Sequence, residues 1–339
     1  MTTSAWWVVN GARDRDWVCG TAPTAAVRDF HRSLPGYAPT RLAPLPGLAR
    51  TAGVARMFAK DESNRLGLPA FKALGASWAI HRALLDRAPA GPVTVVTATD
   101  GNHGRAVARF ARQFGHRAAV FVPDGVHPTA VQAIRDEGAD VTHVPGDYDA
   151  AVRRAAQTAG PDTILVQDMG WGGYEQVPGW IVDGYTTLFA ELDEQLREHG
   201  LTHPDVLVVP AGVGSLLQAA LTHYRSGPAP HGTAVLSVEP RSAACVLASV
   251  AAGHPVTVAT GVTSMAGLNC GTVSSLAWPC ISRGLDACVA VDEDAAAGAA
   301  ATSPATASTP ARAAPPPSPG CMPSATGPRS ASPRPAPWR

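Results

Sequence analysis

A lysine suited to nucleophilic chemistry stands at the start of a predicted helix. Residues 60–75 read Lys-Asp-Glu-Ser-Asn-Arg-Leu-Gly-Leu-Pro-Ala-Phe-Lys-Ala-Leu-Gly, so Lys72 follows Phe71 directly, among small and apolar neighbours. A helix N-terminus and an apolar environment both disfavour the charged ammonium, so we expect a lowered pKa for Lys72. Such an amine forms a Schiff base readily. The alternative is that Lys72 is an ordinary solvated lysine of the helix.

A second polar cluster follows a predicted buried strand. Residues 93–104 read Val-Thr-Val-Val-Thr-Ala-Thr-Asp-Gly-Asn-His-Gly, a strand that leads into a glycine-flanked turn and a helix. Ligands of open α/β sheets bind beyond the carboxyl ends of strands, which places Asp100 and Asn102 at the edge of a site. Asn102 can hydrogen-bond a cofactor oxygen, and Asp100 can move a proton. Either residue could instead cap the following helix, and we interpret His103 as structural.

A third segment has the pattern of an anion-binding turn. Residues 206–217 form a strand, then Gly212-Val213-Gly214-Ser215, then a helix. The glycines allow close approach of an anion, while N–H groups and the helix dipole point toward it, so phosphate is the natural ligand. Tight turns also use glycine for geometry alone. Combined with a Schiff-base lysine and an amide donor, this turn predicts a site for pyridoxal 5'-phosphate (PLP).

The elements that must position these residues alternate between strand and helix. This alternation predicts an α/β fold with a mostly parallel sheet. Strands are expected at residues 93–98, 118–122, 141–144, 163–167, 205–210 and 234–238. Helices are expected at residues 71–87, 103–114, 129–137, 150–158, 179–199 and 215–224.

Composition excludes several other classes of function. The 339 residues carry 27 basic and 27 acidic side chains, so no net charge attracts nucleic acid or an anionic membrane. No segment is apolar for the roughly 18 residues that a membrane span needs. The six cysteines form no C-x-x-C pair, which argues against a zinc site and a disulfide scaffold; we interpret Cys270 as a packed thiol. We expect a soluble, cytoplasmic protein with a small-molecule substrate.

The C-terminal region, residues 295–339, differs in kind from the rest. Apart from Cys321, Met322 and Trp338, it consists of Ala, Pro, Ser, Thr, Gly and Arg. Such a composition buries too little apolar surface to offset the entropy of ordering, so we predict a disordered tail. It is either a genuine linker or the product of a shifted reading frame. The abrupt change after Asp294, before the α/β pattern is complete, favours the shifted frame.

The chain order of these motifs resembles the tryptophan-synthase-like PLP enzymes of fold type II, and within them the diaminopropionate ammonia-lyase family. The resemblance runs from about Arg56 to Val291. Its specific feature is Asp100, because serine and threonine dehydratases usually carry a small or hydroxyl residue there. The other segments that carry it are Lys60–Gly75, Ala98–Gly104, Val166–Asp168, Trp171–Glu175, Pro178–Trp180, Ala211–Gly214, Val238–Pro240 and Met265–Gly271.

The resemblance implies roles for the candidate residues. Lys72 would bind PLP covalently, Asn102 would bond its ring hydroxyl, and Phe71 would pack on the ring. The residues Gly212, Val213, Gly214 and Ser215 would hold the phosphate. Asp100 and Asp168 would be the acid and base, and two carboxylates would accommodate both D- and L-substrates. The implied reaction is α,β-elimination of 2,3-diaminopropionate to pyruvate and ammonia.

The resemblance also implies an architecture. Two open, mostly parallel sheets with helices on both faces would enclose the site in the cleft between two domains. Residues 40–90 and 165–294 would form the large PLP-binding domain, and residues 91–164 the small one; a homodimer is the family expectation. The family's C-terminal Ser-Gly-rich segment is not found after Asp294. Two alternatives therefore stay open: a serine/threonine dehydratase-like lyase, and an inactive remnant.

Overall fold

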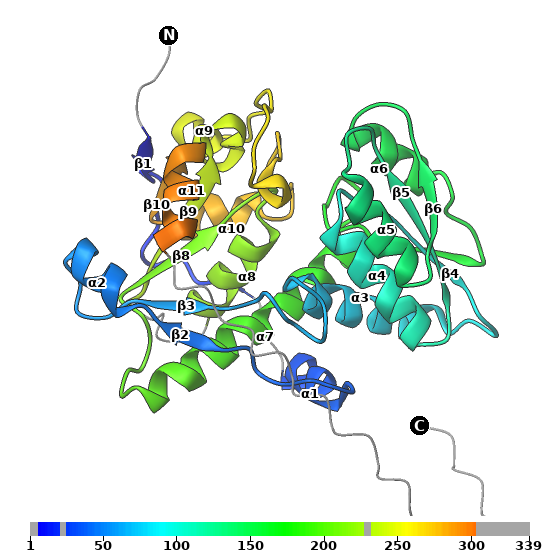
Figure 1. Cartoon of the computed structure of the whole chain (residues 1–339), viewed down its shortest axis with the longest axis horizontal. Helices are drawn as coiled ribbons and strands as arrows, with labels where there is room; N and C mark the ends of the chain where they lie inside the picture. Colours follow the sequence, from blue (N-terminus) through cyan, green and yellow to red (C-terminus); the bar gives the residue numbers. More distant parts are fainter. Residues whose placement is uncertain (1–5, 21–24, 227–231, 303–339) are drawn as a thin grey trace, which may run out of the picture. The chain divides into compact units, whose positions relative to one another are not determined.

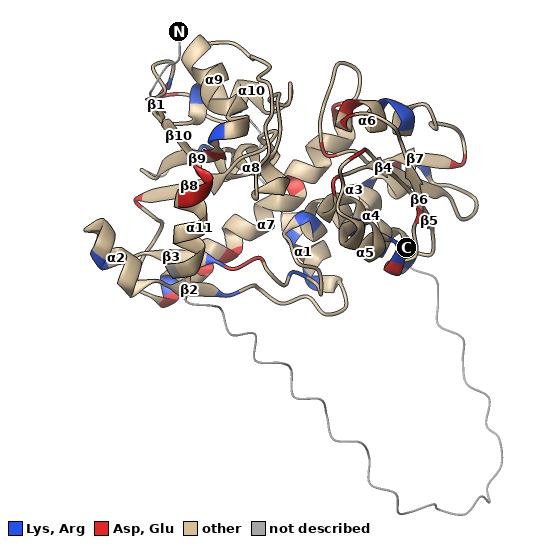
Figure 2. Ribbon diagram, turned by 45° about the horizontal axis from the view of Figure 1, so that its top comes forward, with Lys and Arg blue, Asp and Glu red and all other residues tan. Residues whose placement is uncertain are grey.

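The structure is a computed structural model that describes residues 6–20, 25–226 and 232–302. Within these ranges the strands form two four-stranded sheets and one two-stranded sheet, accompanied by α-helices (Figure 1). Basic and acidic residues are interspersed along the elements of both larger sheets, in keeping with the zero net charge (Figure 2).

One four-stranded sheet is entirely parallel and has the order β6-β5-β4-β7. Val95 and Val120 are fully buried in it, because helices cover a parallel sheet on both faces. Since β4 and β7 are neighbours, the residues that follow them, Asp100 and Asp168, reach the same edge of the sheet. The strands are β4 (Thr94–Ala98), β5 (Arg117–Val122), β6 (Asp140–His143) and β7 (Thr163–Leu165); the helices between them are α4 (Asn102–Gln113), α5 (Pro128–Asp136) and α6 (Tyr148–Ala156).

The second four-stranded sheet has the order β1-β10-β9-β8 and is parallel except for β1. Its strands are β1 (Trp7–Val9), β8 (Val206–Pro210), β9 (Ala234–Pro240) and β10 (Ala287–Val291). The helices that follow them are α8 (Ser215–Tyr224), α9 (Cys245–Ala252), α10 (Trp278–Gly284) and α11 (Glu293–Thr302), with 3-10 turns at Arg241–Ala243 and Ala266–Leu268.

A short antiparallel pair precedes the first long helix. Strands β2 (Leu42–Pro44) and β3 (Phe58–Lys60) pair with each other, and α2 (Pro46–Ala52) lies between them in sequence. Helix α1 (Ala25–Ser33) comes before this pair. Leu42 packs with Leu192 and Leu196 in a small apolar cluster.

Two glycines allow helices α3 (Lys72–Arg87) and α7 (Gln176–Glu198) to pack closely. A Cβ at Gly184 would lie 2.6 Å from the carbonyl oxygen of Leu74, and one at Gly75 would lie 2.5 Å from a ring carbon of Tyr185. Neither side chain fits without displacing a neighbour. This contact fixes the N-terminal end of α3, where Lys72 stands.

A buried ion cluster holds the segment between β3 and α3. The side chains of Arg65 and Glu191 are both fully buried, and Arg65 Nη1 donates to Glu191 Oε1 at 2.7 Å. Lys60 Nζ donates to the other oxygen of Glu191 at 2.8 Å, and Glu62 accepts from Arg65 at 2.6 Å. Because Glu191 belongs to α7, the irregular chain leading to Lys72 is tied to the same helix that packs on α3.

The observed elements confirm the predicted fold class. Each strand and helix expected between residues 71 and 238 is present, with ends displaced by a few residues. The expected disorder from residue 295 is wrong at its start, because α11 continues to Thr302. Its residues up to 301 are mainly alanine, the best helix former, and Glu293 and Asp294 favour a helix N-terminus. The remainder of the predicted tail, 303–339, lies outside the described residues.

No helix in the described ranges combines the length and apolar character that a membrane crossing requires.

Candidate active site

Lys72 is the first residue of α3, and its amine forms an ion pair. Its Nζ donates a hydrogen bond to Asp168 Oδ2 at 2.7 Å, across 96 residues of sequence. Burial is the largest single effect and lowers the pKa of Lys72, but the charge of Asp168, its hydrogen bond and the neighbouring Tyr185 and Cys270 together raise this pKa above its ordinary value. The predicted lowering is therefore wrong for this state, because the expected site carboxylate Asp168 pairs directly with the amine, a contact that no local sequence pattern reveals.

Lysine composition singles out the same residue. The chain has only two lysines, Lys60 and Lys72. Lys60 Nζ donates to Thr40 O at 2.7 Å, Glu191 Oε2 at 2.8 Å and Gln195 Oε1 at 2.8 Å. All three protons of its ammonium are thus engaged in a structural contact. Lys72 is the side-chain amine left for covalent chemistry.

Asp168 stands just beyond β7 and is only 8% exposed. Burial acts to raise the pKa of its carboxyl group, but His103 and the hydrogen-bonded amine of Lys72 hold that pKa well below its usual range. His103 Nδ1 lies 3.8 Å from Asp168 Oδ2, and its Nε2 bonds Val166 O at 2.9 Å. Asp168 is thus a permanent carboxylate at neutral pH.

Asp100 follows β4 at the same sheet edge. The residue as a whole is exposed, but its carboxyl group is partly buried. This burial and, to a smaller extent, the negative charge of Asp168 raise the pKa of Asp100 to about 6, whereas Lys72 acts to lower it. A carboxyl group with this pKa exists in both forms near neutrality, which suits a group that takes and returns a proton. The two carboxylates predicted from the sequence therefore have opposite pKa shifts around one amine.

The predicted phosphate turn joins this cluster through Ser215. Gly214 has φ +98° and is the N-cap of α8, whose first N–H groups have no carbonyl of the helix to bond. A Cβ at Gly214 would lie 2.8 Å from Ile281 Cδ1, and one at Gly212 would lie 2.9 Å from Cys270 Sγ. Ser215 Oγ donates to the carbonyl oxygen of Asp168 at 3.0 Å. The turn therefore lacks a Cβ at two of its four positions and is tied to the residue that binds Lys72.

The remaining predicted residues are Phe71, which lies near the Lys72 amine, Asn102, which is exposed, and Cys270. The Phe71 ring packs edge-on against Tyr185 at 4.9 Å between centroids, and Lys72 Nζ lies 5.5 Å from the Phe71 ring. Asn102 is exposed and begins α4. Burial raises the pKa of Cys270 to about 12, so it is a thiol, as its interpretation as a packed residue requires.

Two polar residues near the site were not predicted. Gln167 Oε1 accepts from Ala98 N at 2.9 Å, which leaves its Nε2 to donate to Tyr148 Oη at 2.6 Å. The charges of Asp168 and Asp100 also act on Tyr148, so its hydroxyl lies near both carboxylates. Gln167 stands beside Asp168 in sequence and could have been included, whereas nothing in the sequence around Tyr148 marks it.

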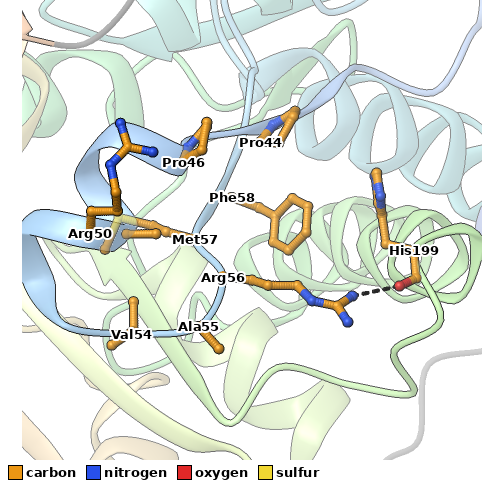
Figure 3. Close-up of a pocket in the computed structure, with 10 residues that line it drawn as sticks. Pro44, Pro46, Arg50, Val54, Ala55, Arg56, Met57, Phe58 and His199 are labelled. Carbon is orange, nitrogen blue, oxygen red and sulfur yellow. Dashed lines mark hydrogen bonds between the residues drawn. The ribbon is translucent and has the colours of Figure 1, made fainter.

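Two hollows on the surface lie away from the candidate residues. One, of about 370 Å³, is bounded by α2, β3 and the end of α7, and none of the candidate residues lines it. Figure 3 shows the Phe58 ring at this hollow and the Arg56 guanidinium turned toward the carbonyl of His199, where it donates a hydrogen bond of 2.6 Å. Within residues 6–20, 25–226 and 232–302, no cluster of His, Cys, Asp or Glu is arranged to hold a metal ion.

Sequence comparison places most of the chain in a single family. Residues 34–303 match the family described as pyridoxal-phosphate dependent enzyme. The diaminopropionate ammonia-lyase of Salmonella typhimurium is 38% identical over 294 residues, which cover 79% of this chain and 72% of the relative. That of Escherichia coli K12 is 38% identical over 268 residues, covering 74% and 67%. An L-threonine dehydratase of Mycobacterium leprae is 34% identical but covers only 48% and 36%.

Solved structures give the same result. Holo diaminopropionate ammonia-lyase from Escherichia coli superposes with a TM-score of 0.80 at 34% identity, covering 86% of this chain and 78% of that one. The same enzyme in complex with D-serine gives 0.79 at 32% identity, covering 86% and 78%.

Proposed function

Because the chain belongs to the pyridoxal-phosphate dependent enzymes and, among them, to the diaminopropionate ammonia-lyases, we propose that it eliminates ammonia from 2,3-diaminopropionate. The α C–H and β C–N bonds break with release of one ammonia, and hydrolysis of the remaining product consumes one water and yields pyruvate and a second ammonia. One observation carries the proposal: a single available lysine is flanked by two carboxylates with opposed pKa shifts.

The residues present fit PLP. A turn with two glycines at a helix N-terminus is a cradle for its phosphate, and we assign Gly212, Val213, Gly214 and Ser215 to it. Lys72 would bond the aldehyde carbon, Phe71 would pack beside the ring, and Asn102 would donate to the ring hydroxyl. When bound, PLP supplies an electron sink for the substrate's α-carbon.

The chain's own residues carry the protons. Asp168 accepts from Lys72 and keeps that amine charged, so the amine must give up its proton before it bonds a carbonyl carbon. Asp100, with a pKa of about 6, is a carboxylate at neutral pH that can take the α-proton and return one to the departing amine. Two carboxylates beside one lysine provide a separate base for each enantiomer of the substrate.

Asp100 also distinguishes the proposal from the dehydratase alternative. A β-ammonium group is attracted by two neighbouring carboxylates, whereas a β-hydroxyl gains no such Coulomb attraction. We therefore propose a preference for an amine leaving group. We further propose a cytoplasmic enzyme, dimeric as the resemblance implies, that acts on free amino acids.

The experiment that tests the proposal starts with added PLP. We expect an absorption band from bound cofactor, borohydride fixation on Lys72, and ammonia and pyruvate from 2,3-diaminopropionate in a ratio of two to one. The matched control is Lys72→Arg, which keeps the charge beside Asp168 but removes the amine. Fixation on Lys60 or on the N-terminal amine would refute the assignment of Lys72. Bound PLP with faster release of pyruvate from serine would favour the dehydratase, and no PLP binding would favour the inactive remnant.

A further inference from the structure

The N-terminal segment, residues 6–20, is held against the C-terminal end of α10. Asn10 is buried, and its Nδ2 donates to the carbonyl oxygen of Leu285 at 2.8 Å. Asp14 N donates to Arg283 O at 3.0 Å. Both carbonyls lie at the end of α10, where a helix leaves its last carbonyls without a partner of its own. The N-terminal segment therefore supplies the hydrogen bonds that complete this helix.

The same segment fixes a cysteine beside α8. Cys19 N donates to Arg225 O at 2.8 Å, immediately after the last residue of α8, and Cys19 Sγ donates to Thr222 Oγ1 at 3.7 Å. Trp17 packs where a glycine of α10 leaves room, because a Cβ at Gly284 would lie 2.9 Å from the Trp17 ring. Cys19 is thus held through both its backbone and its side chain.

Helix α10 brings a second cysteine to Cys19. Cys280 is the third residue of α10, and its side chain shares a hydrogen bond with that of Cys19. Both cysteines are free and partly exposed, so a small oxidant can reach them. Sulfur atoms in such contact need to approach by only about 2 Å to reach the length of a disulfide. The hydrogen bond of Cys19 and then burial raise the pKa of Cys280, so the Cys280 thiol keeps its proton.

We propose that Cys19 and Cys280 form a reversible disulfide when the protein meets a peroxide, and that this bond fastens the N-terminal segment to α10. The Cys19 sulfur attacks one oxygen of hydrogen peroxide and becomes a sulfenic acid, with release of one water. The Cys280 sulfur then attacks the Cys19 sulfur, loses its proton and expels the oxygen as a second water. The two thiols thus give two electrons to the peroxide, and a thiol reductant restores them by disulfide exchange.

The disulfide secures a helix that backs the phosphate turn. A Cβ at Gly214 would lie 2.8 Å from Ile281 Cδ1 and 3.3 Å from Ala277 Cβ, so α10 packs directly on this turn. The N-terminal segment is otherwise attached by hydrogen bonds, by packing and by β1, a strand of three residues. Such attachments at a chain end open locally at low cost, whereas a covalent bond keeps the segment in place. The disulfide depends on the contact between the thiols and not on the reaction proposed above.

The test uses the full chain, treated with hydrogen peroxide or with a thiol reductant and digested with trypsin after free thiols are blocked. Oxidation is expected to link residues 16–28, which contain Cys19, to residues 242–283, which contain Cys280. The second peptide contains two further cysteines, so fragmentation in the mass spectrometer must locate the bond at Cys280. The link is expected to be lost in Cys280→Ser and kept in the control Cys321→Ser, which removes a thiol outside the described residues.

Thermal unfolding gives a second measurement. The midpoint of the oxidised chain is expected to be at least about 5 °C above that of the reduced chain, because a disulfide that closes a long loop constrains the unfolded state. This shift is expected to vanish in Cys19→Ser and in Cys280→Ser, and to persist in Cys321→Ser. A bond located at another cysteine of the unmodified chain, no link between the two peptides, or a shift that persists in Cys19→Ser would overturn the proposal.

Discussion

Replacing Asp100 with asparagine tests the chemistry of the site most directly. The pKa of Asp100 is raised to about 6, so this group is a carboxylate above that pH and a neutral acid below it. A base must be deprotonated to act, so the rate supported by Asp100 is present above pH 6 and is lost as the pH falls through 6. Asp168, whose pKa is held well below its usual range, contributes no titration in this window.

The magnitude follows from the ionised fraction. One pH unit below the pKa, about one tenth of Asp100 is ionised, so kcat/KM at pH 5 is expected to be about tenfold below its plateau. The variant Asp100→Asn cannot accept the proton and is expected to lose about 10²–10⁴-fold at the plateau, with no fall near pH 6. The assay is ammonia release from 2,3-diaminopropionate by the PLP-loaded protein, measured for each enantiomer from pH 5 to 9.

A matched control removes a carboxylate elsewhere on the surface. Asp86 of α3 is exposed, and Asp86→Asn is expected to keep both the rate and the fall near pH 6. If Asp100→Asn retained the fall near pH 6, that titration would belong to another group. If the unmodified protein showed no fall there with either enantiomer, the assignment of Asp100 as a base would be refuted.

Three further predictions concern packing and cofactor binding. Glu191→Gln leaves Arg65 and Lys60 buried without their carboxylate, and urea unfolding is expected to show a loss of about 3–5 kcal/mol; Glu198→Gln, an exposed change on the same helix, should show almost none. Gly184→Ala forces a Cβ to within 2.6 Å of Leu74 O and is expected to lower the free energy of unfolding by about 1–3 kcal/mol. Gly179→Ala in α7, whose nearest neighbour is 4.0 Å away, is its control, and equal losses in the two variants would contradict the reasoning. Gly214→Ala is expected to weaken PLP binding at least about tenfold in an absorbance titration, because φ is +98° and the new Cβ would lie 2.8 Å from Ile281 Cδ1. Its control is Gly36→Ala, which introduces similar backbone strain at φ +77° but in open space, and this variant is expected to leave PLP binding unchanged.

The sequence located the candidate residues at the ends of strands, but it did not predict the contacts between them. Asp100 and Asn102 could be placed because a β-branched strand and a glycine turn precede a helix, and that local pattern is sufficient to locate a strand end. The ion pair between Lys72 and Asp168 spans 96 residues, and only the neighbouring positions of β4 and β7 bring these groups to one edge. The direction of the Lys72 pKa shift depends on this contact and was therefore predicted wrongly.

Several elements and one residue near the site were not predicted because the sequence carries no recognisable pattern for them. Strands β1, β2 and β3 have three residues each, which is too few for a period of two to be recognised. Helix α11 was assigned to the tail because alanine dominates both, although alanine favours a helix where proline does not. Tyr148 reaches the site from α6, and a tyrosine in a polar segment has no sequence pattern that reveals such a contact.

Because the chain has so few lysines, the amount of cofactor fixed on lysine can serve as a measure of the number of active sites. With two lysines among 27 basic residues, the other 25 are arginines, whose guanidinium groups do not condense with aldehydes under ordinary conditions. Lys60 is held by three acceptors, so an aldehyde cofactor finds little competition for Lys72 on the rest of the surface. In the folded protein, the molar ratio of borohydride-fixed cofactor to chain would therefore count competent sites directly.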